Sequence, residues 1–287
     1  MDVDQLQNVR YEPARVARVT MARPEYRNAQ SAQLLRELDA AFSAAADDPS
    51  VRVIVLAGEG DAFSSGHDLG TPEQAAWRAA RDAERPTTEV EASFVYSWDH
   101  FLTMSLRWRD IPKPTIAMVH GWCIFGGWLV ASSMDLIVAA DDARFMTAML
   151  QYFPLPFDVG PRKAKELLFD AHEIGADEAH ELGFVNRVVP RGDLEAETMA
   201  LAGRIAESNP FYLRLAKLAV NNAQDAMGFR ASMTSGHAHY HLSEVSQRQW
   251  ARKKARERGD DANGDGLGGE PRRMPLVDKM LRRSGES

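Results

Sequence analysis

The chain contains a single cysteine, Cys123, among its 287 residues, so no disulfide can form within one copy. It has no apolar run that approaches the roughly 18 uncharged residues of a transmembrane helix. Basic residues are not in excess either, because 34 Lys and Arg are outnumbered by 41 Asp and Glu, which gives a net charge of −7. A broad positive surface for nucleic acid or for an anionic membrane is therefore not expected.

The low cysteine content and the polar N-terminal segment also indicate the cellular compartment. One cysteine agrees with a reducing environment, and the polar N-terminal segment has no apolar run of the signal-peptide type. We therefore expect a cytoplasmic protein. The length allows one large core plus a helical appendage.

Two glycine-containing segments each follow a run of β-branched and small apolar residues. Residues 63–69 (FSSGHDL) follow the predicted strand 51–56, and residues 121–127 (GWCIFGG) follow the predicted strand 115–119. One backbone N–H group from each turn can then meet at a common point. Two such preorganised donors stabilise a thioester enolate or a tetrahedral oxyanion, and removal of one typically costs roughly 3 kcal/mol. The pattern predicts an oxyanion hole.

Together with three further segments, these turns resemble the crotonase superfamily, also called the enoyl-CoA hydratase/isomerase family. The other segments are 23–29 (RPEYRNA), 134–139 (MDLIVA) and 179–190 (AHELGFVNRVVP), in the family's order and at near-family spacing. The resemblance covers nearly the whole chain. It implies an α/β fold, namely a crotonase-like spiral of ββα turns with a C-terminal helical segment. It also implies an acyl-CoA substrate, no separate cofactor, and a homotrimer or dimer of trimers.

Site residues follow from the resemblance by position. It assigns the two oxyanion donors to the N–H groups of Ser65 and Gly126, and it places the adenine near Arg27, Asn28 and Ala29. Further contacts with CoA or substrate are expected in and beside the two turns, from Ser64, Gly66, His67, Asp68, Leu69, Trp122, Phe125 and Gly127. Asp68 has a competing role as a scaffold residue of its turn.

The sequence departs from the family at the acid–base positions. Family hydratases use two glutamates around a water molecule, whereas Leu129 and Met149 stand at those positions here, with Gln151 the nearest polar neighbour of the second. Neither replacement transfers a proton, and each such group typically contributes about 10²- to 10⁴-fold. The sequence therefore does not favour hydration over isomerisation, hydrolysis or carbon–carbon cleavage. The alternative is a catalytically weakened acyl-CoA-binding or assembly protein.

Asp158 is the first candidate for a remaining base. It lies in an apolar segment, within one residue of the functional aspartate that the resemblance implies for dienoyl-CoA isomerases and aryl-CoA dehalogenases, and burial would raise its pKa. The competing interpretation makes Asp158 the cap of a helix that begins near Gly160 and Pro161. His67 and His100 are the next candidates.

The predicted organisation has three parts. Residues 1–205 form the spiral core, residues 206–256 form helices that cover the active site, and residues 257–287 form a flexible tail. Within the core we expect a hairpin over 11–22, a helix over 32–46 capped by Ser31, an insertion over 70–92 and a helix over 94–109.

Three histidines alternate along the predicted C-terminal helices. Only His237 and His241 share a helix face, at i and i+4, and no glutamate or cysteine with metal-ligand spacing joins them. No metal site is therefore expected. The segment is instead expected to line the acyl pocket or a subunit contact.

Overall fold

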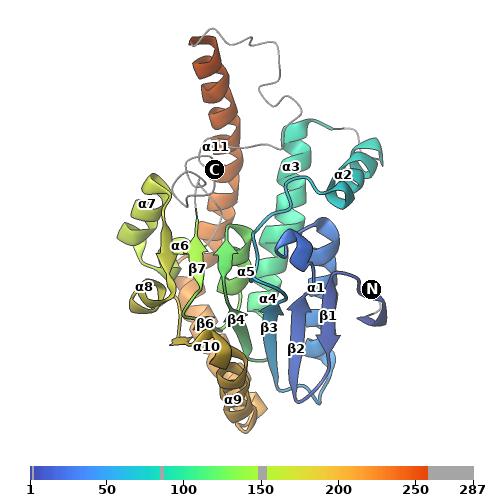
Figure 1. The fold of residues 1–287 in the computed structure, drawn as a ribbon, viewed down its shortest axis with the longest axis vertical. Coiled ribbons are helices and arrows are strands. Elements are labelled where there is room, and N and C mark those ends of the chain that lie inside the picture. The colour runs from blue at the N-terminus through green and yellow to red at the C-terminus, as the bar shows by residue number, and fades with distance from the viewer. Residues whose placement is uncertain (2, 85–86, 148–153, 258–287) are drawn as a thin grey trace.

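The computed structural model describes residues 1, 3–84, 87–147 and 154–257 (Figure 1). A six-stranded sheet in the order β1-β2-β3-β4-β6-β9 forms its centre. The first two strands are antiparallel and every later neighbour is parallel. The strands are β1 (Val9–Glu12), β2 (Val16–Met21), β3 (Val53–Gly58), β4 (Thr115–Val119), β6 (Leu136–Ala140) and β9 (Arg187–Val189).

A second, three-stranded sheet begins immediately after β4. It consists of β5 (Trp122–Ile124), β7 (Arg144–Met146) and β8 (Glu173–Gly175), with β7 in the middle. The sequence predicted only a turn over 121–127, because a three-residue strand is too short for periodicity to reveal. The chain thus passes from one sheet to the next at the carboxyl end of β4. This mixed α/β arrangement confirms the predicted fold class.

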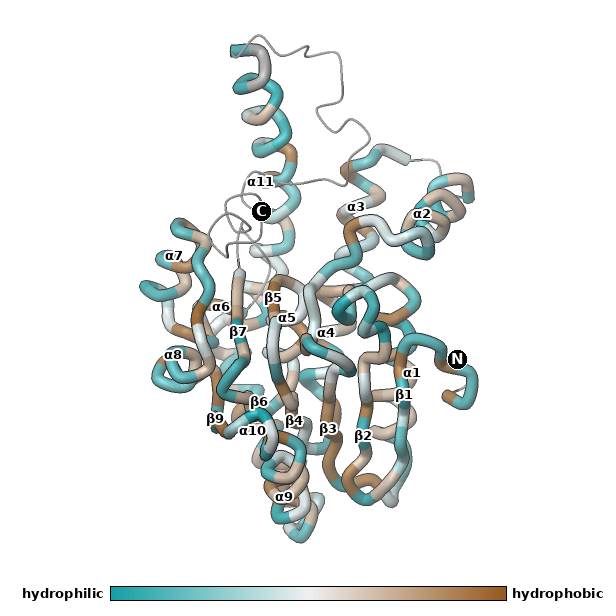
Figure 2. The backbone as a smooth tube through the Cα atoms, viewed as in Figure 1, coloured by the Kyte–Doolittle hydropathy of each residue, from teal (hydrophilic) through white to brown (hydrophobic). Residues whose placement is uncertain are grey.

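Alternation along the central strands creates a core on each face of the large sheet. Ile54 and Leu56 of β3 point into the cluster shared with α1 (Ala32–Asp47), whereas Val53 and Val55 point into the cluster shared with α9 (Leu194–Ala206). β3 is therefore buried along its whole length and is continuously apolar (Figure 2). The predicted cap of α1 is confirmed, because Ser31 accepts a hydrogen bond from Leu34 N at 3.2 Å.

The predicted insertion is mostly helical. It contains α2 (Pro72–Glu84), and the next helical run begins at Glu89 rather than at residue 94. That run comprises α3 (Glu89–Ser97), a π-helical segment (Trp98–Thr103) and α4 (Met104–Arg109). Irregular π turns occur frequently at functional sites. The predicted hairpin over 11–22 corresponds to β1 and β2, and the register begins at Val9 opposite Met21.

The remaining helices flank the second sheet or extend from the core. They are α5 (Gly126–Ser132), α6 (Leu155–Asp158), α7 (Pro161–Asp170), α8 (Ala176–Glu181), α10 (Pro210–Ala226) and α11 (Phe229–Glu257). The two predicted C-terminal helices over 210–254 are confirmed. Figure 1 shows α11 rising alongside α3, with which it is in contact. The tail predicted over 257–287 lies outside the described residues, except for Glu257.

Candidate active site

The two turns meet in the structure. Ser64 forms an isolated parallel bridge with Cys123, through Ser64 N to Trp122 O at 3.0 Å and Ile124 N to Ser64 O at 3.1 Å. Two residues later Gly66 adopts a left-handed φ of +87°, and a Cβ there would lie 2.7 Å from Ile124 O and 3.0 Å from Gly126 N. The backbone of the first turn is therefore packed against the start of α5.

The second turn is strained at the residue before α5. Phe125 is not glycine, yet it has φ 50° and ψ −115°, and its N–H donates to Met146 O at 3.0 Å. Such a conformation costs of order 1–3 kcal/mol and is concentrated at functional sites. It orients Gly126 as the first residue of α5, where the backbone N–H has no intrahelical acceptor.

Gly126 and Gly127 have no room for a side chain. A Cβ on Gly126 would lie 2.3 Å from Gln30 Oε1 and 2.8 Å from His67 Nδ1, and one on Gly127 would lie 2.7 Å from Ser64 O. These distances also show that the His67 imidazole lies beside Gly126. Its ring is packed edge-on against Phe101, with centroids 4.1 Å apart.

The Ser65 N–H does not point where the sequence assignment requires. It donates to Arg27 O at 2.9 Å, so it is directed at the 23–30 segment. His67 instead pairs with Gln30 in a parallel bridge, in which Gln30 N donates to Gly66 O and Asp68 N donates to Gln30 O. In a bridge of this kind the N–H of the central residue, His67, points away from Gln30.

The predicted adenine segment is partly a scaffold. Arg27 is exposed, but Asn28 is fully buried and its amide donates to Glu59 O and Ala62 O, both at 2.9 Å. Asn28 Oδ1 accepts from Arg23 N at 2.9 Å. Ala29 is also buried. Of the three, only Arg27 presents its side chain to solvent.

Ser64 and Gln30 complete the buried polar layer under the turns. Ser64 Oγ donates to Asn28 O at 2.9 Å and accepts from Gly66 N at 3.1 Å and from Gln30 Nε2 at 3.3 Å. The sequence patterns do not reveal Gln30 as a site residue, although it directly follows the 23–29 motif. Its Oε1 is buried, and no hydrogen bond to it exists within the described parts of the chain.

Asp68 fulfils its scaffold role. Its carboxylate is buried and accepts bonds from Arg23 Nη1 at 3.2 Å, Gly70 N at 3.1 Å and Thr71 N at 2.9 Å. Burial opposes the charge, but bonds from Thr71, Gly70 and Arg23 outweigh it and lower the pKa of Asp68. The structure therefore indicates that this carboxylate supports the turn and does not contact CoA directly.

Two other predicted contact residues are accessible. Leu69 is 52 % exposed, and Trp122 is partly exposed on β5.

His100 is turned away from the two turns. Its Nδ1 lies 3.2 Å from Tyr96 O, and its ring packs against Tyr96 and Trp77 at centroid distances of 4.6 and 5.5 Å. Desolvation lowers its pKa. The structure thus brings His67 to the turns and leaves His100 against α2.

Asp158 contacts α5, the helix that begins at the second turn. Its Oδ2 accepts bonds from Trp128 Nε1 at 2.9 Å and Ser132 Oγ at 2.7 Å. It does not cap the next helix, because α7 begins after Gly160 and no side chain caps its first turn. Desolvation raises the pKa of Asp158 to about 6, although both hydrogen bonds oppose this shift.

His237 and His241 of α11 pack against α3. The Nε2 atoms of both lie 2.7 Å from Ser97 Oγ, and both rings contact Phe94. Within the described ranges no three His, Cys, Asp or Glu side chains gather in a metal-binding arrangement. Desolvation, reinforced by His241, lowers the pKa of His237 to about 4.

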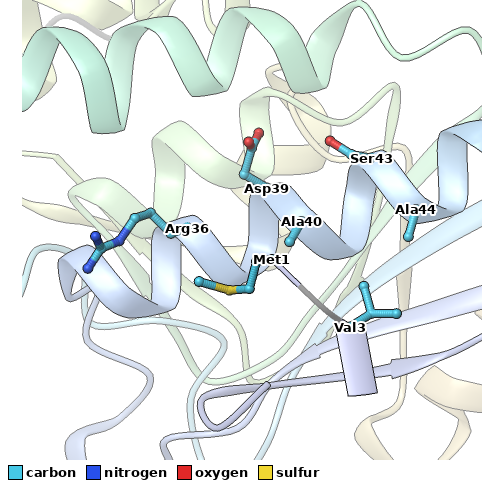
Figure 3. A pocket seen from close by; sticks show the side chains of 7 residues that line it. All are labelled: Met1, Val3, Arg36, Asp39, Ala40, Ser43 and Ala44. Carbon is cyan, nitrogen blue, oxygen red and sulfur yellow. The ribbon is translucent and has the colours of Figure 1, made fainter. Parts of the chain in front are cut away.

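A surface groove of about 600 Å³ lies elsewhere, between the N-terminal segment and α1 (Figure 3). It is lined by Met1, Val3, Arg36, Asp39, Ala40, Ser43 and Ala44. None of these residues belongs to either turn, so this groove is not part of the candidate site.

Comparison with known proteins identifies the family. The family described as enoyl-CoA hydratase/isomerase matches residues 11–262. The chain belongs to this family. EchA13 of Mycobacterium tuberculosis, which carries a provisional enoyl-CoA hydratase name, is 38% identical over 258 residues, which cover 81% of each chain.

Solved structures of the enoyl-CoA hydratase/isomerase family superpose on the protein. A protein of Mycobacterium thermoresistibile, also provisionally named an enoyl-CoA hydratase, is 42% identical with a TM-score of 0.75, covering 83% of this chain and 97% of that one. An enoyl-CoA hydratase/isomerase of Xanthobacter autotrophicus Py2 is 30% identical with a TM-score of 0.71, covering 98% and 95%. Among the described helices, none combines the length and the apolar composition that a membrane span requires.

Leu129 is an apolar core residue in this family member. It lies on α5, is 0 % exposed and belongs to the main hydrophobic cluster. Met149 and Gln151, the other residues singled out at the acid–base positions, lie outside the described residues. At the first of the two positions, the structure therefore contains no group that can transfer a proton.

The contact between the turns can be tested with Gly127→Ala. The new Cβ would meet the Ser64 carbonyl at 2.7 Å, so we expect a loss of about 1–3 kcal/mol in the free energy of unfolding. Gly203→Ala is the matched control, because Gly203 lies within α9 and a Cβ there meets nothing within 4 Å. It should raise stability by about 0.5–1 kcal/mol. Equal urea midpoints for the two variants would contradict the contact.

Proposed function

We propose that the protein binds an acyl-CoA thioester and stabilises its enolate with two backbone N–H groups where the turns meet. The main support is the approach of Gly66 to Gly126 N, which leaves the first N–H of α5 at the junction of the two turns. Gly126 supplies one donor. We assign the other to the His67 N–H instead of Ser65, because the Ser65 N–H is directed at Arg27 O.

Asp158 is the proposed base. Its carboxylate takes a proton from the carbon next to the thioester carbonyl, and the electron pair of that C–H bond moves onto the carbonyl oxygen, which the two N–H groups stabilise. A pKa of about 6 keeps the group ionised at neutral pH yet more basic than an ordinary aspartate. His67, beside Gly126, is the second candidate.

Such chemistry needs one base and no cofactor besides the CoA thioester itself. Returning the proton to a different carbon moves a double bond, and an enolate is also the product of carbon–carbon cleavage next to a thioester. Isomerase and lyase outcomes are therefore favoured over hydration, which needs water activation as well as protonation. We propose a cytoplasmic location for this reaction.

Exchange of the α-protons of butyryl-CoA with deuterated water tests the proposal without knowledge of the natural acyl group. We expect the wild-type protein to incorporate deuterium, at a rate that rises with pH through about 6 because the ionised carboxylate is the active form. Asp158→Asn should lower the rate by on the order of a hundredfold or more and leave acyl-CoA affinity nearly unchanged. Mass spectrometry and calorimetric titration measure the two quantities.

His67→Gln is the comparison variant for this experiment. Its exchange rate should fall less than that of Asp158→Asn, since the backbone N–H is retained. Loss of exchange in His67→Gln with activity preserved in Asp158→Asn would transfer the role of base to His67.

Hydration of crotonyl-CoA should be slow or absent. Leu129 is buried and apolar at the position of one family glutamate, so water cannot be activated there. The decrease in enoyl-thioester absorbance measures the reaction. Hydration at a rate comparable to ordinary hydratases would disprove the importance assigned to this replacement.

An acyl-CoA-binding or assembly protein is the second candidate function, and the apolar Leu129 is the observation that favours it. The two functions differ in one measurement. Tight binding of acyl-CoA without any α-proton exchange in the wild-type protein would support binding alone.

The exposed apolar face of α10, which the described parts of the chain leave open, supports the proposed homotrimer or dimer of trimers. No residue of α10 is buried, and its side chains at Phe211, Tyr212, Leu215, Leu218 and Val220 are 47–65 % exposed. Phe211, Leu215 and Leu218 share one face at helical spacing. Contacts with other copies would cover this surface. We propose that α10 and α11 also cover the active site, since α11 contacts the π-helical segment, whose Phe101 packs against His67.

Sedimentation equilibrium should therefore give a mass of three or six chains at micromolar concentration. The double variant Leu215→Lys and Leu218→Lys should shift the protein toward monomer, because it places charges in the buried interface. Ser246→Lys with Gln247→Lys adds the same charge at exposed polar positions of α11 and should leave the mass unchanged. A monomeric wild-type protein would contradict the assembly.

A further inference from the structure

Both hydrogen bonds to Asp158 go to the same carboxylate oxygen. Trp128 Nε1 and Ser132 Oγ approach Oδ2 at 2.9 and 2.7 Å, and the two donors lie at i and i+4 on one face of α5. Across the described ranges, no hydrogen bond involves Oδ1. The two oxygens of this carboxylate therefore differ in environment.

The first donor is held firmly by the core. Trp128 is 0 % exposed, and its ring is stacked on Phe184 at a centroid distance of 4.5 Å and an interplanar angle of 21°. Phe145 packs edge-on against it at 5.9 Å. The indole cannot rotate without moving these rings, so its N–H is fixed in direction before any substrate binds.

Trp128 and Ser132 connect Asp158 to the second turn, because both lie on the helix that begins there. Trp128 follows Gly126 by two residues, which corresponds to about 3 Å of helix rise. α5 thus carries the proposed N–H donor at its first residue and a support for the proposed base one half-turn later. In the proposed function, one short helix thus fixes both the donor to the enolate oxygen and the orientation of the base.

We propose that Trp128 and Ser132 are positioning residues, which hold Oδ2 of Asp158 and leave Oδ1 as the atom that takes the α-proton. This inference rests on the proposed enolate-forming function and specifies how its base is oriented. If each donor bonded to a different carboxylate oxygen, neither oxygen would be available to take the proton. The observed arrangement keeps one oxygen available.

Within the described parts of the chain, no charged side chain contributes to the pKa shift of Asp158. α5 has no ionisable side chain between Gly126 and Ser132, and on α7 Lys163 is paired with Glu166 and Glu178 at 2.9 and 2.7 Å. Burial, which raises the pKa of Asp158, and the bonds from Ser132 and Trp128, which lower it, are the influences that set its acidity. Removal of either donor must therefore raise the pKa further.

Ser132→Ala and Trp128→Phe each remove one donor, and the pH profile of α-proton exchange provides the readout. A lost bond to an ionised group should move the acid limb of the profile upward by roughly one pH unit. Exchange on the alkaline plateau should also fall in Ser132→Ala, by roughly tenfold, because one of the two bonds that orient the carboxylate is lost. A purely structural role would change stability without moving the limb.

Two variants serve as controls. Ser132→Thr retains the hydroxyl and should keep the wild-type profile. Ser133→Ala removes the neighbouring hydroxyl, which donates to Leu129 O at 2.8 Å and not to Asp158, and it should leave the limb in place. A shift of equal size in Ser133→Ala would overturn the assignment.

Infrared titration of the protein with ¹³C-labelled aspartate gives a second readout that needs no turnover, with Asp158→Asn identifying the band. We expect a wild-type midpoint near pH 6, and this midpoint should move upward in Ser132→Ala. An unmoved midpoint or an unmoved acid limb would overturn the positioning role. Absence of exchange from the wild type at every pH, with the midpoint still moving, would instead reject the proposed enolate chemistry.

Discussion

The close contact between two glycine turns is the constraint on which the rest of the site depends. Parallel pairing of β3 with β4 brings the chain after each strand to the same region, and the bridge between Ser64 and Cys123 continues this pairing beyond the large sheet. Glycine at 66 and 127 then allows backbone to approach backbone at distances that a Cβ atom would not permit. Glycine at 126 leaves room in the same way for the side chains of Gln30 and His67. The N-terminus of α5 is presented at that contact.

The polar groups beneath the turns have mainly structural roles. Asn28, Ser64 and Asp68 are buried and bonded to backbone groups, and so they define the shape of the turns. Gln30 differs, because its Oε1 has no hydrogen-bond partner in the described part of the chain. Buried polar atoms without partners are few in native proteins, and this one lies directly against Gly126.

Burial has opposite effects on the two acid–base regions. At Leu129 it produces an apolar core position that cannot take part in proton transfer, whereas at Asp158 it desolvates a carboxyl and raises its pKa toward neutrality. Two hydrogen bonds from α5 limit that rise. The helix α5, which has Leu129 in place of a glutamate, therefore donates two hydrogen bonds to an aspartate of α6. This arrangement is consistent with chemistry that uses a single base.

The sequence alone determined the strand 115–119, the glycine turns, the capped helix after Ser31 and the family. It also located the strand predicted over 51–56, which the structure places two residues later, at Val53–Gly58. Each depends on local periodicity or on backbone conformations that few residues adopt. Only the tertiary structure decided the direction of the Ser65 N–H, the short strand β5, the partners of Asp158 and the orientation of His100. Hydrogen bonds between segments far apart in the chain fix these features, and residue spacing carries no information about which acceptor lies opposite a given donor.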